Sequence, residues 1–287
     1  PVLIIKTAWG GKSLHTDFRP PSAGVYEFTE AQVKELEKRG KDVEAERAAR
    51  AEASGHDYRQ MMEHVKAVLA DIERVVPGHD AAAGYELAGF VWFQGWNDMV
   101  DGSVYPQRNR PGGYDTYSEL LAQFIREVRR DLSAPSLPFV IGVMGVGGPL
   151  EEYAPDQQRY RGVHGNFRRA MAAPAALPEF RGSVVAVETA PFWDRAVVAL
   201  RAREKELTPR LDAIETEVKE GRRTEEEGRT ARERLYAETF TAKELTLLRE
   251  STSNFDFHYM GSARILAPIG KAFAEAVVAI DRRAKKD

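Results

Sequence analysis

Four short apolar runs, separated by helical patterns, constrain the fold of this chain more than any other feature. They are rich in β-branched residues and lie at residues 2–5, 90–93, 139–143 and 184–187. Each run is apolar throughout, which is typical of strands that helices cover on both faces of a parallel sheet. Apolar residues at spacings of three and four predict helices at residues 58–76 and 117–128, and a last helix is expected at about residues 264–280. This alternation predicts an α/β fold with a doubly wound parallel sheet in three layers.

Two highly charged stretches interrupt this order, at about residues 29–54 and 196–250. Each contains a capping box, in which two side chains satisfy free backbone N–H groups at a helix start: Thr29 with Gln32, and Thr224 with Glu227. The first stretch predicts an exposed helix over 30–52. The second predicts a long antiparallel helical hairpin with a coiled-coil seam. This hairpin either packs on itself beside the sheet or serves as an arm through which the protein forms a homo-oligomer.

The composition excludes several classes of function. The formal net charge is −3, so the chain has no field that would gather nucleic acid or an anionic membrane surface, and we expect a small, roughly neutral substrate. Without cysteine the chain has neither disulfides nor thiolate metal ligands. No apolar run approaches the ~20 residues that a membrane-spanning helix needs. We expect a single domain, residues 1–287, that carries both charged insertions.

Polar side chains and glycines follow the apolar runs at the points where the strands should end. In open α/β sheets, ligands bind outside the carboxyl ends of the strands. The first, second and fourth runs are followed by residues 9–14, 94–98 and 188–191, and residues 256–259 stand just before the last helix. These segments should converge on one edge of the sheet, which is therefore the candidate site.

This edge offers three of the four parts that serine-based ester hydrolysis requires. His258 is the candidate general base, because imidazole titrates near neutrality, and Asp256 is placed to hold its tautomer. A backbone N–H of Gly10 or Gly11 is a candidate donor to the oxyanion. A glycine pair after a strand is equally typical of a plain turn with positive φ, and one of six histidines is often an ordinary surface residue.

Side-chain amides supply a second oxyanion donor, because Gln94 and Asn97 follow the second apolar run. The neighbouring Asp98 is equally suited to accept backbone N–H groups as the cap of a turn. Three tryptophans of these segments either stack on a sugar ring or pack in the core, which is the commoner fate of aromatic residues: Trp9, Trp92 and Trp96.

Three blocks of sequence stand at these positions: residues 5–14 (IKTAWGGKSL), 92–98 (WFQGWND) and 258–263 (HYMGSA). Together and in this order they resemble the sialate O-acetylesterase and acetylxylan esterase families of the SGNH hydrolase superfamily. The resemblance covers the four-strand framework and not the charged insertions. It implies a flavodoxin-like sheet and no metal or organic cofactor. It also implies these roles: Gly10 or Gly11 as the glycine donor, Asn97 as the asparagine, His258 as the base and Asp256 as its partner.

The chain departs from the pattern of these families in three places. Many relatives carry Gln-Gly-Glu-x-Asp in the middle block, whereas Trp96 replaces the glutamate here, so either Gln94 or Asn97 is the oxyanion amide. Relatives often place aspartate three residues before the histidine, and here the gap is two. The family's nucleophile block, a Gly-Gln-Ser-Asn turn, has no counterpart. Ser13 does not replace it, because it lies beyond the glycine pair and outside a strand-to-helix elbow.

We therefore expect a carbohydrate O-acetyl esterase, acting on an acetylated carbohydrate, whose serine lies upstream of residue 1. The first residue is not methionine and the chain opens directly on an apolar run, which also predicts upstream sequence. The resemblance suggests a secreted or periplasmic enzyme. The alternative is a non-catalytic protein of this fold, either one that binds glycans or an assembly protein built around the helical hairpin.

Overall fold

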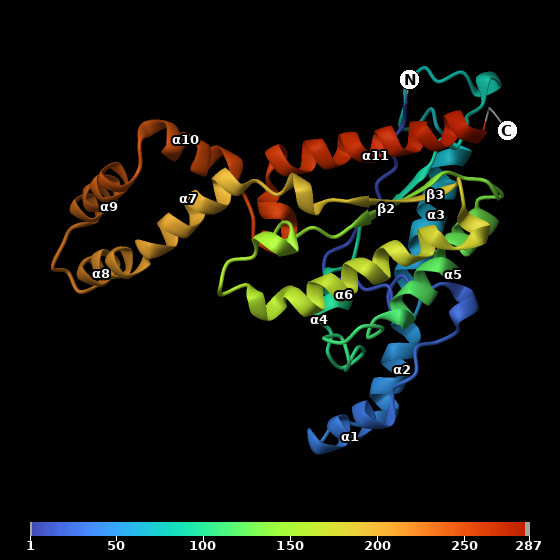
Figure 1. The fold of residues 1–287 in the computed structure, drawn as a ribbon, viewed down its shortest axis with the longest axis horizontal. Helices are drawn as coiled ribbons and strands as arrows, with labels where there is room; N and C mark the ends of the chain where they lie inside the picture. The colour runs from blue at the N-terminus through green and yellow to red at the C-terminus, as the bar shows by residue number, and fades with distance from the viewer. Residues whose placement is uncertain (1, 285–287) are drawn as a thin grey trace. The chain divides into compact units, whose positions relative to one another are not determined.

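The fold contains a parallel sheet of three strands, in a computed structural model that describes residues 2–284 (Figure 1). The strands lie in the order β1-β2-β3 and comprise Phe90–Trp92, Phe139–Val143 and Val184–Glu188. Their register pairs Phe139 with Phe90 on one side and with Val184 on the other. Three of the four predicted strands and their parallel direction are thereby confirmed, and the chain has a mixed α/β fold.

The α-helices of the described residues belong either to the predicted framework or to the two insertions. The framework helices are α3 (His56–Ala70), α4 (Trp96–Val100), α5 (Asp115–Asp131), α6 (Arg161–Ala172) and α11 (Ala263–Ala284). The insertion helices are α1 (Glu30–Lys38), α2 (Val43–Ala53), α7 (Arg195–Glu206), α8 (Thr208–Lys219), α9 (Glu225–Thr239) and α10 (Ala242–Ser251). The three predicted framework helices correspond to α3, α5 and α11, although α3 ends at Ala70 rather than at residue 76.

Helices cover both faces of the sheet. On one face Phe124 of α5 packs against Trp92, with ring centroids 4.4 Å apart. On the other face Phe273 of α11 packs against Phe93, with centroids 5.2 Å apart. Side chains alternate along an extended chain, so consecutive residues 92 and 93 reach opposite layers. A β-carbon on Gly142 of β2 would overlap the Phe273 ring, and glycine at this position therefore lets α11 approach the sheet.

The predicted strand over residues 2–5 is wrong. This segment has no regular secondary structure, and its Val2 and Ile4 are 89% and 84% exposed. A strand requires a hydrogen-bonded neighbour, and no described strand pairs with this segment. Among the described strands, the edge strand β1 pairs with β2 alone, and its Val91 is 43% exposed. An apolar run predicts burial, but it does not supply the strand that would complete the pairing.

The first insertion forms two helices, so the prediction of one helix over 30–52 is wrong in that respect. The capping box of Thr29 with Gln32 is present at the start of α1. The chain turns at Gly40, whose φ of +67° is the left-handed conformation that glycine adopts without strain. Asp42 then caps α2, because its side chain accepts two backbone N–H groups of the first turn.

The second insertion packs on itself as a helical hairpin, in which α8 lies against α9 and α7 against α10. It contains four helices, since α7 gives way to α8 at Leu207 and a further capping box, Thr241 with Glu244, separates α9 from α10. The predicted capping box of Thr224 with Glu227 starts α9. Its apolar core consists of Leu200, Leu207, Leu235, Phe240 and Leu248. A role of this hairpin in oligomerisation stays a prediction.

Two compact units make up the described residues. The first comprises residues 2–145, 150–189 and 272–284 and includes the sheet, and the second comprises Val146–Pro149 and Ala190–Lys271. The expected single domain over residues 1–287 stays a prediction. Within residues 2–284, none of the helices has the length and apolar composition needed to cross a membrane.

Candidate active site

The glycine pair lies in a turn of the first unit, between the irregular segment 2–9 and the buried loop 13–16. Gly11 has a φ of +75°, which explains why glycine stands there. Around both glycines the structure is open, because an added β-carbon would meet no atom within 4 Å. Neither the Gly10 nor the Gly11 N–H has an acceptor among the described residues. The two N–H groups are therefore free to bind a ligand oxygen.

Two side-chain amides bind the backbone of Lys12, directly after the glycine turn. Gln94, two residues after the end of β1, and Asn97, on α4, both donate to the carbonyl oxygen of Lys12, at 3.0 and 3.1 Å. The Gln94 Nε2 also donates to Asp98 Oδ2 at 2.7 Å, so both of its N–H groups are used. The second N–H of Asn97 Nδ2 meets no acceptor among the residues described. Asn97 alone of this pair retains a donor for a ligand.

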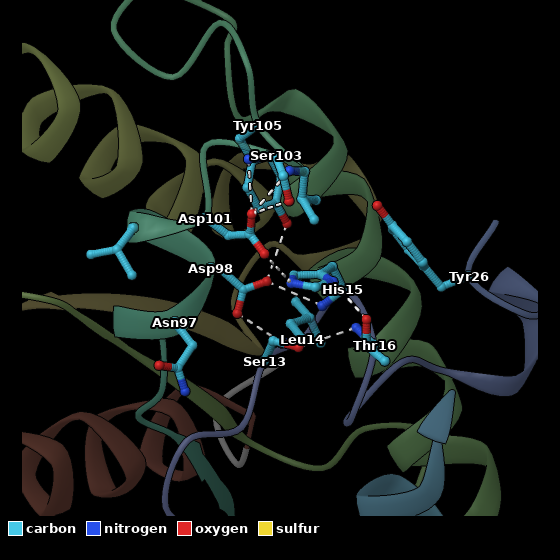
Figure 2. A network of polar contacts seen from close by, with 12 residues as sticks. Ser13, Leu14, His15, Thr16, Tyr26, Asn97, Asp98, Asp101, Ser103 and Tyr105 are labelled. Atoms are coloured by element: carbon cyan, nitrogen blue, oxygen red, sulfur yellow. Dashed lines mark hydrogen bonds and ion pairs between the residues drawn. The ribbon is translucent and has the colours of Figure 1, made fainter. Parts of the chain in front are cut away.

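Asp98 is fully buried and anchors the loop rather than acting as a free acid. Figure 2 shows the polar contacts around it. Its carboxylate accepts the backbone N–H groups of Leu14 at 2.8 Å and His15 at 3.1 Å, and the Tyr105 hydroxyl at 3.2 Å. Burial raises the pKa of Asp98, while the nearby His15 and the N–H donors oppose that rise. The predicted alternative, an Asp98 whose oxygens are taken by backbone N–H groups, describes this arrangement, although the donors are remote in sequence.

His15 is a buried histidine that the sequence did not mark as part of the site. Its Nδ1 lies 2.7 Å from Thr16 Oγ1, and its Nε2 lies 3.6 Å from Asp101 Oδ2 (Figure 2). The interaction with His15 is the main cause that lowers the pKa of Asp101 well below its usual range, and Ser103 adds a second hydrogen bond. Because His15 is 4% exposed, it supports the loop and does not face a substrate.

Ser13 lies in the same loop and is 5% exposed. Its hydroxyl donates to Asp17 Oδ2 at 2.8 Å and accepts the Thr16 N–H. Ser13 therefore has no free hydroxyl with which to attack an ester.

The predicted base and its predicted partner both lie in the second unit, but no hydrogen bond or ion pair joins them among the described residues. His258 is exposed, and its Nδ1 lies 2.9 Å from Asn254 Oδ1. Asp256 instead accepts a hydrogen bond from Arg201 Nη1 at 2.7 Å. Asn254, which sequence reasoning missed, occupies the position beside the ring for which Asp256 was predicted.

The tryptophans of the site segments differ in burial. Trp92 is 4% exposed and packs in the core against Phe124. Trp9, beside the glycine turn, is 39% exposed, and its ring centroid lies 5.9 Å from that of Phe18. Of these two tryptophans, Trp9 is the one that is partly exposed beside the glycine turn. Within residues 2–284, no three His, Asp or Glu side chains are grouped as a metal site.

The chain was compared with known protein families. A family model described as carbohydrate esterase, sialic acid-specific acetylesterase, matches residues 1–173, which is more than half of the chain. No curated protein and no solved structure matches the chain. The matched range includes the glycine turn, Gln94 and Asn97, and it ends before the loop of His258.

Proposed function

Because the chain belongs to this family of carbohydrate esterases, we propose that it carries most of a serine-dependent O-acetyl esterase that removes acetyl groups from sugars or polysaccharides. The observation that carries the proposal is the set of free donors in the matched range: the N–H groups of Gly10 and Gly11 and the second N–H of Asn97. Such preorganised donors stabilise the negative oxygen that forms when an ester carbonyl is attacked. The proposal includes a doubly wound sheet of the SGNH type.

The attacking serine of this proposal comes from sequence upstream of residue 1. Its oxygen adds to the acetyl carbonyl carbon while His258 takes the hydroxyl proton. The imidazolium then protonates the departing sugar oxygen as the ester bond breaks. Water, deprotonated by the same ring, releases acetate and restores the serine. Neither Ser13 nor Asp98 has a role in these proton transfers, because both are buried and hydrogen-bonded.

The assay that tests this function measures acetate release from acetylated carbohydrate. The protein that includes the upstream sequence should release acetate from an acetylated sugar and p-nitrophenol from the acetate ester. Residues 1–287 alone, as the matched control, should do neither, because they lack the nucleophile. The proposal would be rejected if the longer protein released no acetate, or if residues 1–287 alone turned over at the same rate.

Asn97 is the amide that we assign to the oxyanion, because Gln94 has no N–H left to donate. We expect Asn97→Ala to lower kcat by roughly 10²-fold, with little change in KM, as found for loss of one oxyanion donor. The measurement is steady-state hydrolysis of the acetate ester. Asn109→Ala, at an exposed asparagine of the same unit, is the control and should keep full activity. A kcat that Asn97→Ala leaves unchanged would exclude Asn97 from this role.

A further inference from the structure

The loop that carries His258 has an unusual backbone. Tyr259, Met260 and Gly261 all have positive φ, at 52°, 58° and 58°. For residues other than glycine this conformation costs on the order of 1–3 kcal/mol each, and such strain tends to be found at functional sites. Tyr259 and Met260 are buried, at 6% and 1% exposure, and their packing holds the backbone in place. Gly261 adopts its positive φ without strain, and a β-carbon there would also overlap Ser253 Oγ.

This backbone folds His258 back onto Asn254. The N–H groups of Ser253 and Asn254 both donate to the Met260 carbonyl, at 2.8 and 3.0 Å. The N–H groups of His258 and Met260 both donate to the Phe255 carbonyl, each at 3.0 Å. These four bonds close the loop of residues 253–260. The Nδ1 of His258 consequently lies 2.9 Å from Asn254 Oδ1.

The protonation of the ring follows from a second contact of the same oxygen. Asn254 Oδ1 also accepts the backbone N–H of Phe255, at 2.8 Å. A backbone N–H can only donate, so the Asn254 atom at this position is the carbonyl oxygen and not the amide nitrogen. An oxygen acceptor facing Nδ1 requires a proton on Nδ1. In the neutral ring Nε2 is then the unprotonated nitrogen, which is the one that a general base needs.

The carboxylate that the sequence suggested for this task is engaged elsewhere. Asp256 is paired with Arg201, with a distance of 2.7 Å between Asp256 Oδ1 and Arg201 Nη1. Among the described residues, no hydrogen bond or ion pair joins Asp256 to His258.

We propose that Asn254 is the positioning residue of His258, accepting its Nδ1–H and so presenting Nε2 as the base. The role of the ring in hydrolysis rests on the proposed function, whereas the tautomer does not. The arrangement is a serine, histidine and asparagine set, in which a neutral amide replaces the usual carboxylate. A neutral partner fixes the direction of the ring without adding a charge beside it.

The tautomer can be measured on the 287-residue chain by ¹⁵N NMR of histidine-labelled protein, with His258 assigned by its absence in His258→Gln. Above the titration range of the ring, Nδ1 should carry the proton and Nε2 should not. Asn254→Ala should shift the ring signals toward the Nε2–H form. Asn254→Asp, which keeps an acceptor, and Asp256→Asn, the matched control, should both retain Nδ1–H. A majority of Nε2–H in the unaltered chain, or a shift in Asp256→Asn alone, would overturn the proposal.

The kinetic test uses the protein with its upstream sequence. We expect Asn254→Ala to lower kcat about 10- to 100-fold with KM unchanged, Asn254→Asp to restore most of the rate, and Asp256→Asn to change kcat less than about twofold. Loss of kcat in Asp256→Asn, with Asn254→Ala fully active, would assign the role to Asp256 instead. Absence of acetate release in every form would reject the proposed function and leave the NMR result on the tautomer standing by itself.

Discussion

Replacing His258 by alanine should lower kcat for acetate ester hydrolysis by about 10⁴-fold or more, while the thermal unfolding midpoint stays unchanged. The expected loss is large because the same ring removes the proton from the serine and later delivers it to the leaving oxygen. The stability should be unchanged because His258 is exposed and its ring makes a hydrogen bond to Asn254, while its backbone hydrogen bond to Phe255 survives in alanine. Initial rates and a thermal scan on the same preparation measure both quantities.

His64→Ala is the matched control for this prediction. His64 is an exposed histidine of α3 in the first unit, so its removal should alter neither the rate nor the unfolding midpoint. Turnover that survives in His258→Ala would contradict the assignment of the base. A loss of rate accompanied by a midpoint several degrees lower would show instead that the ring supports the loop.

The framework of the fold could be predicted because each of its parts has a local signature. All five residues of β2 are buried, so an uninterrupted apolar run marks it, and α5 carries an apolar stripe that faces the sheet. Residues 2–5 have the same composition and are exposed, because strand formation depends on a neighbouring strand as well as on the run itself. Strand pairing depends on two segments, so the sequence of one segment does not predict it.

The sequence predicts which segments form the candidate site, but it does not predict which atoms in them contact one another. The glycine turn, Gln94 and Asn97 were identified from residue type and position, and two of them do meet at Lys12. That meeting point is a backbone carbonyl, which every residue has, so no side chain marks it. Asn254 was missed for a related reason. Its contact with His258 depends on positive φ at Tyr259 and Met260, and neither residue type indicates that conformation.

Asp98→Ala should lower the free energy of unfolding of the first unit by about 3–5 kcal/mol. The carboxylate is the shared acceptor of four donors: the N–H groups of Leu14 and His15, the Gln94 amide and the Tyr105 hydroxyl. Removing it leaves these donors without a partner in a site where Asp98 is fully buried. Urea unfolding followed by circular dichroism measures the change, and Asp156→Ala, at an exposed aspartate of the same unit, is the control.

The same substitution should also reduce catalysis in the protein with its upstream sequence, because Asp98 fixes the loop of residues 12–16 against α4. Asn97 contacts the Lys12 carbonyl and Asp98 accepts the Leu14 N–H, so both residues fix α4 to the loop that follows the glycine turn. A shift of about 1 Å between catalytic groups can cost roughly 10²-fold in rate. The rate of Asp98→Asn should lie between those of the unaltered protein and Asp98→Ala. Asparagine keeps one acceptor oxygen, but its amide N–H groups face donors that had bound the carboxylate. An Asp98→Ala protein as stable as the unaltered chain would mean that water replaces the carboxylate, and the loop would then need another anchor.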